Sequence, residues 1–343
     1  MISKKGNTAH PNTCVRVKAP ARLHLGFLDL NGDSGRKFGS IGIAINTHHT
    51  IVKVEYAESI NVISQCASSD TIRRAEAIIA QFYLSLGKTI SKAAQAISLT
   101  IEQLIPEHSG FGSGTQLALA IGTALSVLHN LDFTTAEIAQ QLGRGNRSGI
   151  GIATFEHGGF VIDGGNKPNH TQPPPLLIHH QLPETWRMVL IIDPHHQGVH
   201  GQQEKQAFST LAKFPLENSQ AICHLTLMQL LPALMEKELS QFGHAITQIQ
   251  MLIGDHFSSA QGGRYTSEKV ASLLEHALTL GHTGIAQSSW GPTGVIFVEN
   301  DVEAKSLMTE LTTYAQSTFS DDNELDLVLA QANDCGAIID ITS

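Results

Sequence analysis

Apolar positions recur along the chain with two different periods. Residues 96–101 alternate with the period of two that is typical of a half-buried strand, whereas residues 70–86 place apolar side chains three or four positions apart, as an amphipathic helix does. Further strands are expected at 15–18, 21–30, 40–45, 50–56, 158–163, 188–192, 295–298 and 336–341. Further helices are expected at 117–129, from a Thr-x-x-Glu capping box at 134–137, within 202–256, at 267–280 and at about 302–317. The pattern shows no internal repeat.

A glycine-rich segment joins the strand at 96–101 to the helix that follows. This segment, residues 106–116, reads PEHSGFGSGTQ and is called the glycine loop below. Glycines let a backbone adopt positive φ and approach a ligand closely, and the next helix directs its free N–H groups at the loop. The arrangement suits a phosphate or pyrophosphate group. A tight turn without a ligand would have a similar local sequence.

The loop matches neither of two common phosphate motifs. No Lys follows the glycines, which excludes a Walker A loop, and Gly110, Gly112 and Gly114 are spaced two apart, unlike G-x-G-x-x-G.

Length, charge and cysteine content limit the classes of protein. A chain of 343 residues suggests two domains or one large one, and the Pro-rich stretch at 166–185 places a boundary between residues 1–175 and 186–343. The formal charge of −9 argues against nucleic acid as a partner. No apolar run reaches about 18 residues, so neither a membrane span nor membrane binding is expected. The four separated cysteines are expected to be buried free thiols in a reducing cytoplasm.

Two pairs of cationic side chains are candidates for a polar site. Arg22 and His24 share one face of a predicted strand, which fits a solvated edge and the wall of a polar site equally well. Arg144 and Arg147 lie among four glycines, where a solvated helix end is the alternative to bidentate binding of a carboxylate or phosphate. We favour the anion-binding interpretation, because the glycine loop lies in the same region of the chain.

A histidine cluster invites a metal-binding interpretation. His195, His196 and His200 are close in sequence, but no Cys or Glu completes a recognised zinc pattern. A polar loop after the strand at 188–192 is the favoured interpretation.

Four segments, in order, resemble the β-ribofuranosylaminobenzene 5′-phosphate synthases of the GHMP kinase superfamily. They are R-L-H-L-G-F-L-D at 22–29, S-G-F-G-S-G-T-Q-L-A-L at 109–119, G-R-G-x-R-S-G-I-G through D-G-G at 143–165, and Q-S-S-W-G-P-T at 287–293. The resemblance covers most of the chain and implies an α+β, two-domain GHMP kinase-like fold. The implied N-terminal α+β domain carries the glycine loop, the C-terminal domain is an α/β sandwich, and the site lies between them.

The chain departs from the superfamily's kinases at two positions. The loop serine that helps those kinases to hold Mg²⁺ falls on Gly114, and the aspartate of their S-G-x-D segment falls on Gly151. Both losses argue against phosphoryl transfer, which depends on positioning and charge stabilisation. An ATP-dependent small-molecule kinase and a non-catalytic binder of a phosphorylated metabolite stay open as alternatives.

The resemblance implies a decarboxylating phosphoribosyl transfer. Phosphoribosyl pyrophosphate would react with p-aminobenzoate or 4-hydroxybenzoate, releasing CO₂ and pyrophosphate, as an early step of methanopterin-type cofactor synthesis, with Mg²⁺ as cofactor. Both substrates are small molecules, and a homodimer is compatible with the sequence.

Roles for individual residues follow from the resemblance and from chemistry. His24, Arg147 and Asp163 are the catalytic candidates, and Glu107 is the candidate metal ligand. The candidates for substrate binding are Arg22, Ser109, Gly110, Gly112, Ser113, Gly114, Thr115, Gln116, Arg144 and Trp290, the last as a wall for the aromatic ring.

Overall fold

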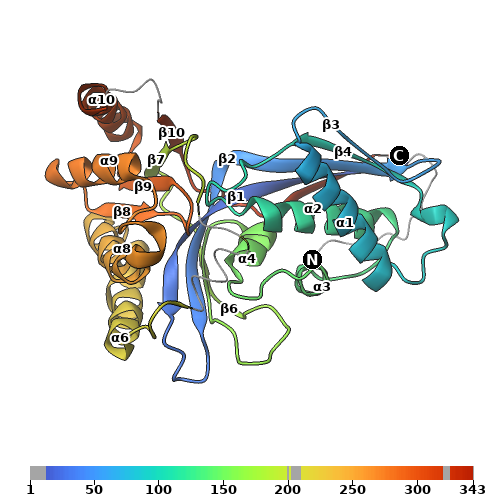
Figure 1. The fold of residues 1–343 in the computed structure, drawn as a ribbon, viewed down its shortest axis with the longest axis horizontal. Coiled ribbons are helices and arrows are strands. Elements are labelled where there is room, and N and C mark those ends of the chain that lie inside the picture. The colour runs from blue at the N-terminus through green and yellow to red at the C-terminus, as the bar shows by residue number, and fades with distance from the viewer. Residues whose placement is uncertain (1–12, 199–200, 202–209, 320–324, 343) are drawn as a thin grey trace.

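The computed structural model consists of two halves joined by a pair of long strands (Figure 1). It describes residues 13–198, 201, 210–319 and 325–342. One half holds a sheet of seven strands, and the other holds a sheet of four. The expected α+β fold in two parts is therefore confirmed.

The N-terminal half is a sheet with helices on one side. Its strands are β1 (Cys14–Asp29), β2 (Phe38–Tyr56), β3 (Asn61–Ser64), β4 (Ile97–Gln103), β5 (Phe160–Asp163), β6 (Leu176–His180) and β11 (Ile338–Thr342). They run in the order β11-β1-β2-β4-β3, and β5 pairs with β2 and with β6. The helices are α1 (Ser69–Ser85), α2 (Ser113–Leu128), α3 (Thr135–Gln141) and α4 (Ile150–His157), with a short 3₁₀ helix at Ala93–Gln95. The predicted capping box opens α3, where Thr134 and Glu137 exchange hydrogen bonds.

Strands β1 and β2 serve both halves of the molecule. They pair antiparallel along their whole length, with a register shift between Pro20 and Ala21. Before the shift, Val15 and Val17 pack into the core beneath α1 and α2. After it, Leu23 and Leu25 belong to the core that also contains the C-terminal helices. The segments predicted as separate strands at 15–18 and 21–30, and at 40–45 and 50–56, are therefore one strand each.

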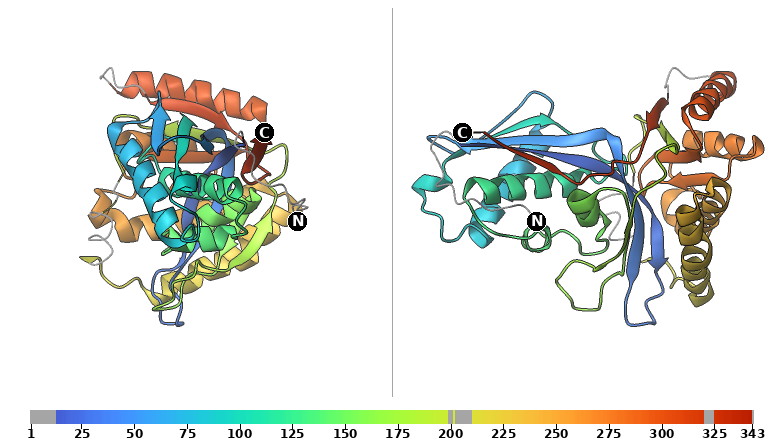
Figure 2. Two further views of the ribbon diagram at one scale, coloured as in Figure 1. Left: turned by 90° about the vertical axis from the view of Figure 1, so that its right-hand side faces the viewer. Right: turned by 180° about the vertical axis from the view of Figure 1, so that it is seen from behind.

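The C-terminal half packs its helices against the sheet β10-β7-β9-β8 (Figure 2). The strands are β7 (Arg187–Ile192), β8 (Gly284–Gln287), β9 (Thr293–Val298) and β10 (Asp326–Ala330), all paired antiparallel. The helices are α6 (Leu216–Leu225), a π-helical turn η2 (Thr226–Leu230), α7 (Leu231–Glu236), α8 (Leu239–Gln261), α9 (Glu268–Thr279) and α10 (Asp301–Thr318). The predicted helices at 267–280 and 302–317 correspond to α9 and α10.

The last strand returns to the first sheet. β11 pairs with β1 from Cys14 opposite Thr342 to Lys18 opposite Ile338. The predicted division at 175–186 lies close to the first crossing between the halves, because β6 belongs to one sheet and β7 to the other. Residues 338–342, which the prediction placed in the C-terminal unit, complete the N-terminal sheet instead.

The cysteines are free but not buried. Cys66, Cys223 and Cys335 are exposed and Cys14 is half-buried, so the prediction of buried thiols is wrong. Sulfur in these positions contributes little to either core.

Among the described helices, none has the length and apolar character that crossing a bilayer requires.

Gly158 ends α4 in a conformation that other residues rarely adopt, and it lies against the chain segment that leads to β11. Its φ is 73° and its ψ is −159°, and a Cβ there would lie 2.4 Å from the carbonyl oxygen of Cys335. Gly143 also has positive φ, at 68°, but a Cβ there would meet nothing within 4 Å.

We therefore expect Gly158→Ala to lower the free energy of unfolding by about 3 kcal/mol or more, through backbone strain and overpacking. Gly143→Ala should cost about 1–2 kcal/mol, the cost of positive φ alone. Urea denaturation of both variants measures the difference. Equal losses would mean that the C-terminal segment does not press on Gly158.

Candidate functional site

The glycine loop turns β4 into α2 and opens a cavity at the start of the helix. Gly110 and Gly112 have φ of 84° and 79°, and Gly112 is the residue that precedes the first turn of α2. The cavity, of about 480 Å³, is lined by Gly110, Gly112, Ser113, Gly114 and Thr115. It is called the loop cavity below. The first N–H groups of α2 and the positive end of its dipole therefore face a space that fits a phosphate group.

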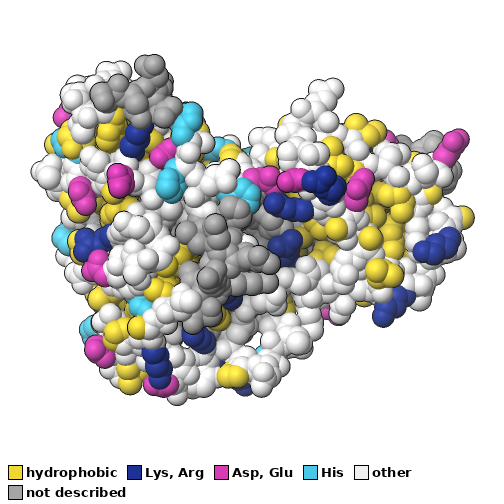
Figure 3. Space-filling model, in the orientation of Figure 1, with side chains coloured by type: hydrophobic (Ala, Val, Ile, Leu, Met, Phe, Trp, Pro, Cys, Tyr) yellow, Lys and Arg dark blue, Asp and Glu magenta, His cyan; other side chains and the backbone are white. Residues whose placement is uncertain are grey.

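Three arginines from separate elements line the loop cavity. They are Arg22 on β1, Arg74 on α1 and Arg144 between α3 and α4. Among the described residues of this cavity, none carries a carboxylate. On the face drawn in Figure 3, Lys and Arg side chains lie near the middle of the molecule, with Asp and Glu side chains beside them. A chain with a formal charge of −9 thus gathers positive charge at one place, which favours a ligand with several negative charges.

Arg22 holds the glycine loop by two hydrogen bonds. Its backbone N–H donates to the carbonyl oxygen of Phe111 at 3.1 Å, and its Nη1 donates to the carbonyl oxygen of Gly110. A Cβ on Gly112 would lie 3.0 Å from the guanidinium carbon of Arg22. Glycine at 112 is therefore required for this close approach as well as for its positive φ.

The C-terminal half contributes the other support of the loop. The connection between β8 and β9 places the Ser288 Oγ 2.8 Å from the carbonyl oxygen of Gly110 and the Thr293 Oγ1 2.7 Å from that of Ser109, and both hydroxyls donate. A Cβ on Gly291 would lie 2.3 Å from the Gly110 nitrogen. The site is therefore built from both halves, as the resemblance implied.

His24 is buried beneath the loop and neutral. Its side chain is 4% exposed, its Nδ1 accepts a hydrogen bond from the Gly26 N–H, and burial, with Arg22 and then Arg147 adding repulsion, lowers its pKa to about 3. Its Nε2 has no hydrogen-bond partner among the described residues and borders a cavity of about 30 Å³, the volume of one water molecule. Arg147 is not among the described residues that line the loop cavity.

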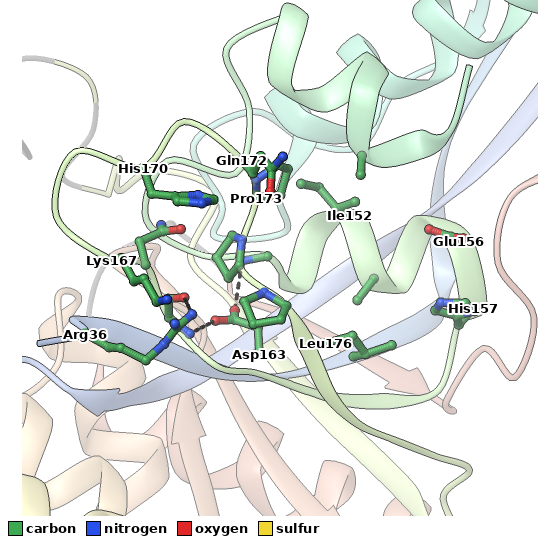
Figure 4. Close-up of a pocket in the computed structure, with 17 residues that line it drawn as sticks. Arg36, Ile152, Glu156, His157, Asp163, Lys167, His170, Gln172, Pro173 and Leu176 are labelled. Atoms are coloured by element: carbon green, nitrogen blue, oxygen red, sulfur yellow. Dashed lines mark hydrogen bonds between the residues drawn. The ribbon is translucent and has the colours of Figure 1, made fainter. Parts of the chain in front are cut away.

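Asp163 lies outside the loop cavity. It is 1% exposed at the end of β5, and its carboxylate accepts hydrogen bonds from the N–H groups of Gly149 and Gly165, both at 2.8 Å (Figure 4). It borders a different cavity, of about 470 Å³, with Arg36 and Lys167. Burial raises its pKa to about 6, and these hydrogen bonds oppose the shift. In this structure Asp163 holds the start of α4, which corrects its predicted place beside the reacting atoms.

Glu107 is engaged by α1 instead of pointing into the cavity. Its carboxylate accepts from Arg74 at 2.6 Å and from the hydroxyl of Thr71 at 3.1 Å. Within the described part of the chain, no three His, Cys, Asp or Glu side chains lie close enough together to hold a metal ion. The contacts of Glu107 give no support to its predicted role as a metal ligand.

Three further candidates have mixed positions. Gln116 is fully buried and donates to the carbonyl oxygen of Gly151 at 2.8 Å, so its side chain joins α2 to α4. Ser109 places its backbone oxygen, not its hydroxyl, in the contact with Thr293. Trp290 is buried against Phe257 and also lines the loop cavity, so it belongs to the core and to the site.

His195 and His196 do not line the loop cavity. They border a fourth cavity, of about 420 Å³, beside Asp193 and the start of α9. Asp193 accepts hydrogen bonds from the His195 N–H and the Ser267 hydroxyl, so it orders this turn. His200 lies outside the described residues.

Three residues of the site were not predicted from the sequence. Arg74 lies on the outer part of an amphipathic helix, where Lys and Arg are common, so its spacing gives no signal. Ser288 and Gly291 belong to a segment that was recognised, but their contact with the glycine loop depends on how the halves pack. The hydroxyls and glycines of residues 106–116 and 287–293 were the sequence feature that could have indicated this contact.

The buried neutral His24 predicts how stability depends on pH. Its pKa in the folded state is far below the 6.5 of the unfolded state, so its contribution to stability is complete above pH 6.5 and is lost as pH falls toward about 3. We expect His24→Gln to reduce the slope of unfolding free energy between pH 6 and 4 by about 1.4 kcal/mol per pH unit, the effect of one proton. Urea titrations across this range, with pH 8 as the reference, measure it. An unchanged slope would show that His24 is protonated in the folded protein.

Comparison with known proteins agrees with this architecture. Residues 74–159 match the family described as GHMP kinases N terminal domain, and residues 230–316 match GHMP kinases C terminal. A crystal structure of homoserine kinase from Cytophaga hutchinsonii superposes with a TM-score of 0.70 at 16% identity, covering 98% of this chain and 100% of that chain. At that identity the likeness shows the fold alone, and it confirms the predicted GHMP kinase-like fold.

Relatives with higher identity carry a different name. The chain is 32% identical over 311 residues to the beta-ribofuranosylphenol 5′-phosphate synthase of Archaeoglobus fulgidus, covering 88% of this chain and 92% of that protein. It is 35% identical over 256 residues to the protein of the same name from Methanocaldococcus jannaschii, covering 69% of this chain and 76% of that protein. The alignments span both halves. The chain therefore belongs to the beta-ribofuranosylphenol 5′-phosphate synthase family, within the GHMP kinase superfamily.

Proposed function

We propose that this protein is an enzyme that transfers a phosphoribosyl group from phosphoribosyl pyrophosphate to a para-substituted benzoate, with loss of CO₂ and pyrophosphate. The observation that carries the proposal is the loop cavity, where the start of α2 and three arginines face one space without a carboxylate among its described residues. A pyrophosphate group matches this charge, and the names of the relatives denote the corresponding ribosyl phosphate product.

The reaction can be written as a balanced exchange of bonds. The bond between the ribose C1 and the pyrophosphate oxygen breaks, and its electron pair leaves with pyrophosphate. The ring carbon that bears the carboxylate then bonds to C1. Finally the bond from the ring to the carboxylate breaks, CO₂ leaves, and its electron pair restores the aromatic ring. A hydroxyl or amino group para to that carbon supplies the electron density for the attack.

The residues of the loop cavity act on the departing pyrophosphate. The N–H groups at the start of α2 donate hydrogen bonds to its oxygens, and Arg22 and Arg144 supply fixed positive charge where negative charge develops. Trp290 closes one side of the cavity and gives the ring an apolar wall. Neutral His24, beside Arg22 and Arg147, adds no further positive charge that would repel the oxocarbenium-like ribose.

We propose 4-hydroxybenzoate as the acceptor. Loss of its carboxylate leaves a phenol, the product named for both archaeal relatives, whereas p-aminobenzoate leaves an aniline. We infer the place of the reaction in methanopterin-type cofactor synthesis from the resemblance of the sequence motifs, and the cytoplasm from the free cysteines. A homodimer stays a prediction.

Mg²⁺ is expected to arrive with the substrate. Magnesium sites often use substrate phosphates and water with one or two protein carboxylates. Glu107, the nearest candidate in sequence, is already paired with Arg74. When bound, the ion would supply charge neutralisation on the pyrophosphate group.

The alternative of an ATP-dependent kinase is disfavoured by two missing side chains. By resemblance, the superfamily's kinases carry an aspartate where this chain has Gly151 and a loop serine where it has Gly114. A Cβ on Gly151 would lie 3.1 Å from the side chain of Thr115, so an acid there would also require a small shift of Thr115.

One assay separates the three functions. The full-length protein is incubated with phosphoribosyl pyrophosphate, Mg²⁺ and either 4-hydroxybenzoate or p-aminobenzoate, and CO₂ and pyrophosphate are measured. We expect equal amounts of both products, with 4-hydroxybenzoate preferred. ATP consumption on an acceptor without CO₂ would support the kinase, and ligand-induced thermal stabilisation without any product would support a binding protein.

Arg147 provides a test of the site within this reaction. Its charge is one of the causes that lower the pKa of His24. We expect Arg147→Ala to lower kcat/KM at least about 100-fold, which corresponds to about 3 kcal/mol of lost transition-state stabilisation, with an unchanged melting temperature. Arg16→Ala is the control, because Arg16 pairs with Glu102 on the exposed part of the first sheet. Normal turnover in the Arg147 variant would remove Arg147 from the site.

A further inference from the structure

Arg74 and Arg144 both line the loop cavity. Arg74 comes from α1, and Arg144 follows α3, so the pair depends on how these helices pack. Burial is the larger cause that lowers the pKa of the Arg144 guanidinium, and the charge of Arg74 adds to it. An anion that contacts both side chains would relieve this repulsion.

The two arginines are held in different ways. Arg74 is 44% exposed and is tied by Nη1 to the Glu107 carboxylate at 2.6 Å. The backbone N–H of Arg144 donates to the carbonyl oxygen of Ala139 at 2.7 Å, which fixes the position of the Arg144 backbone. The buried Nε of Arg144 has no hydrogen-bond partner among the described residues. A buried donor without a partner is costly, so the position of Arg144 is unfavourable until an anion binds its guanidinium.

Gly114 lies beside Arg144. The Arg144 Nη1 lies 3.7 Å from the position that a Cβ on Gly114 would take, which is an ordinary van der Waals distance. A side chain longer than a methyl group at 114, such as the serine of the kinases, would therefore lie next to a guanidinium, which offers planar, paired donors for phosphate oxygens.

We propose that Arg74 and Arg144 form a clamp that binds the pyrophosphate group of the donor substrate, in the place where the superfamily's kinases use a loop serine and a metal ion. This inference rests on the proposed function and assigns the leaving group to these two residues. Glu107 is a positioning residue, because it acts through Arg74. The clamp selects a sugar 1-diphosphate by its terminal pyrophosphate, which inorganic pyrophosphate can represent in a binding experiment.

The direct test is calorimetric titration of the full-length protein with inorganic pyrophosphate and Mg²⁺. We expect Arg74→Ala and Arg144→Ala each to weaken binding at least about 10-fold, as loss of a charged hydrogen-bond donor does. Arg73→Ala is the matched control, because Arg73 is adjacent on α1 but pairs with Asp70 and does not line the cavity. It should bind within twofold of the wild type.

Two more variants separate binding from structure. Glu107→Gln keeps an oxygen for Arg74 and should bind pyrophosphate within about threefold of the wild type, whereas a weakening as large as that of Arg74→Ala would make Arg74 merely structural and overturn the proposal. Gly114→Ser should weaken binding by crowding Arg144. If Arg74→Ala has a reduced melting temperature, Arg74→Lys, which keeps the ion pair but not the planar donors, replaces it.

The outcomes also separate this inference from the proposed function. A wild-type protein that binds pyrophosphate with the expected pattern of variants but releases no CO₂ contradicts the proposed reaction and keeps the clamp. An active wild type whose Arg74 and Arg144 variants bind pyrophosphate as Arg73→Ala does contradicts the clamp and keeps the reaction.

Discussion

The close approach of two glycine-rich backbones is the constraint on which this site depends. Gly110 and Gly291 come from different halves of the molecule, and neither has room for a Cβ. The hydroxyls of Ser288 and Thr293 hold the loop by its carbonyl oxygens, which leaves its N–H groups for the cavity. The direction of α2 and the width of the loop cavity therefore follow from how the halves pack, and a shift of one half would alter both.

The charge of the residues that line the loop cavity is opposite in sign to the net charge of the chain. The chain is acidic, yet the described residues of the loop cavity include arginines and no acid. The acid within the glycine loop, Glu107, has its carboxylate paired with the side chains of Arg74 and Thr71. Burial keeps His24 neutral, so the arginines beside it do not face another cation. Such an arrangement gives an anion a favourable place although the chain as a whole is acidic.

The sequence predicted those features of the fold that depend on neighbouring residues in the chain. The periodicity of α1, the capping box of α3 and the glycine loop each depend on neighbours in the chain, and each was predicted. The roles of Asp163 and Glu107 could not be read in this way, because a carboxylate is defined by the donors that fold against it. Arg74 was missed for the same reason. The single long strand β2 was predicted as two, since its polar middle, at 46–49, interrupts the apolar pattern without ending the strand.

The pairing of β11 with β1 affects how the protein is made. The edge of the first sheet is completed by β11, whose residues are synthesised long after those of β1. Until then β1 exposes an unpaired edge, which is a template for association with other chains. Contacts between such distant residues also slow folding, because a long loop must close before they form. The N-terminal half, although it carries the glycine loop, is therefore expected to reach its final form only after β11 has been synthesised.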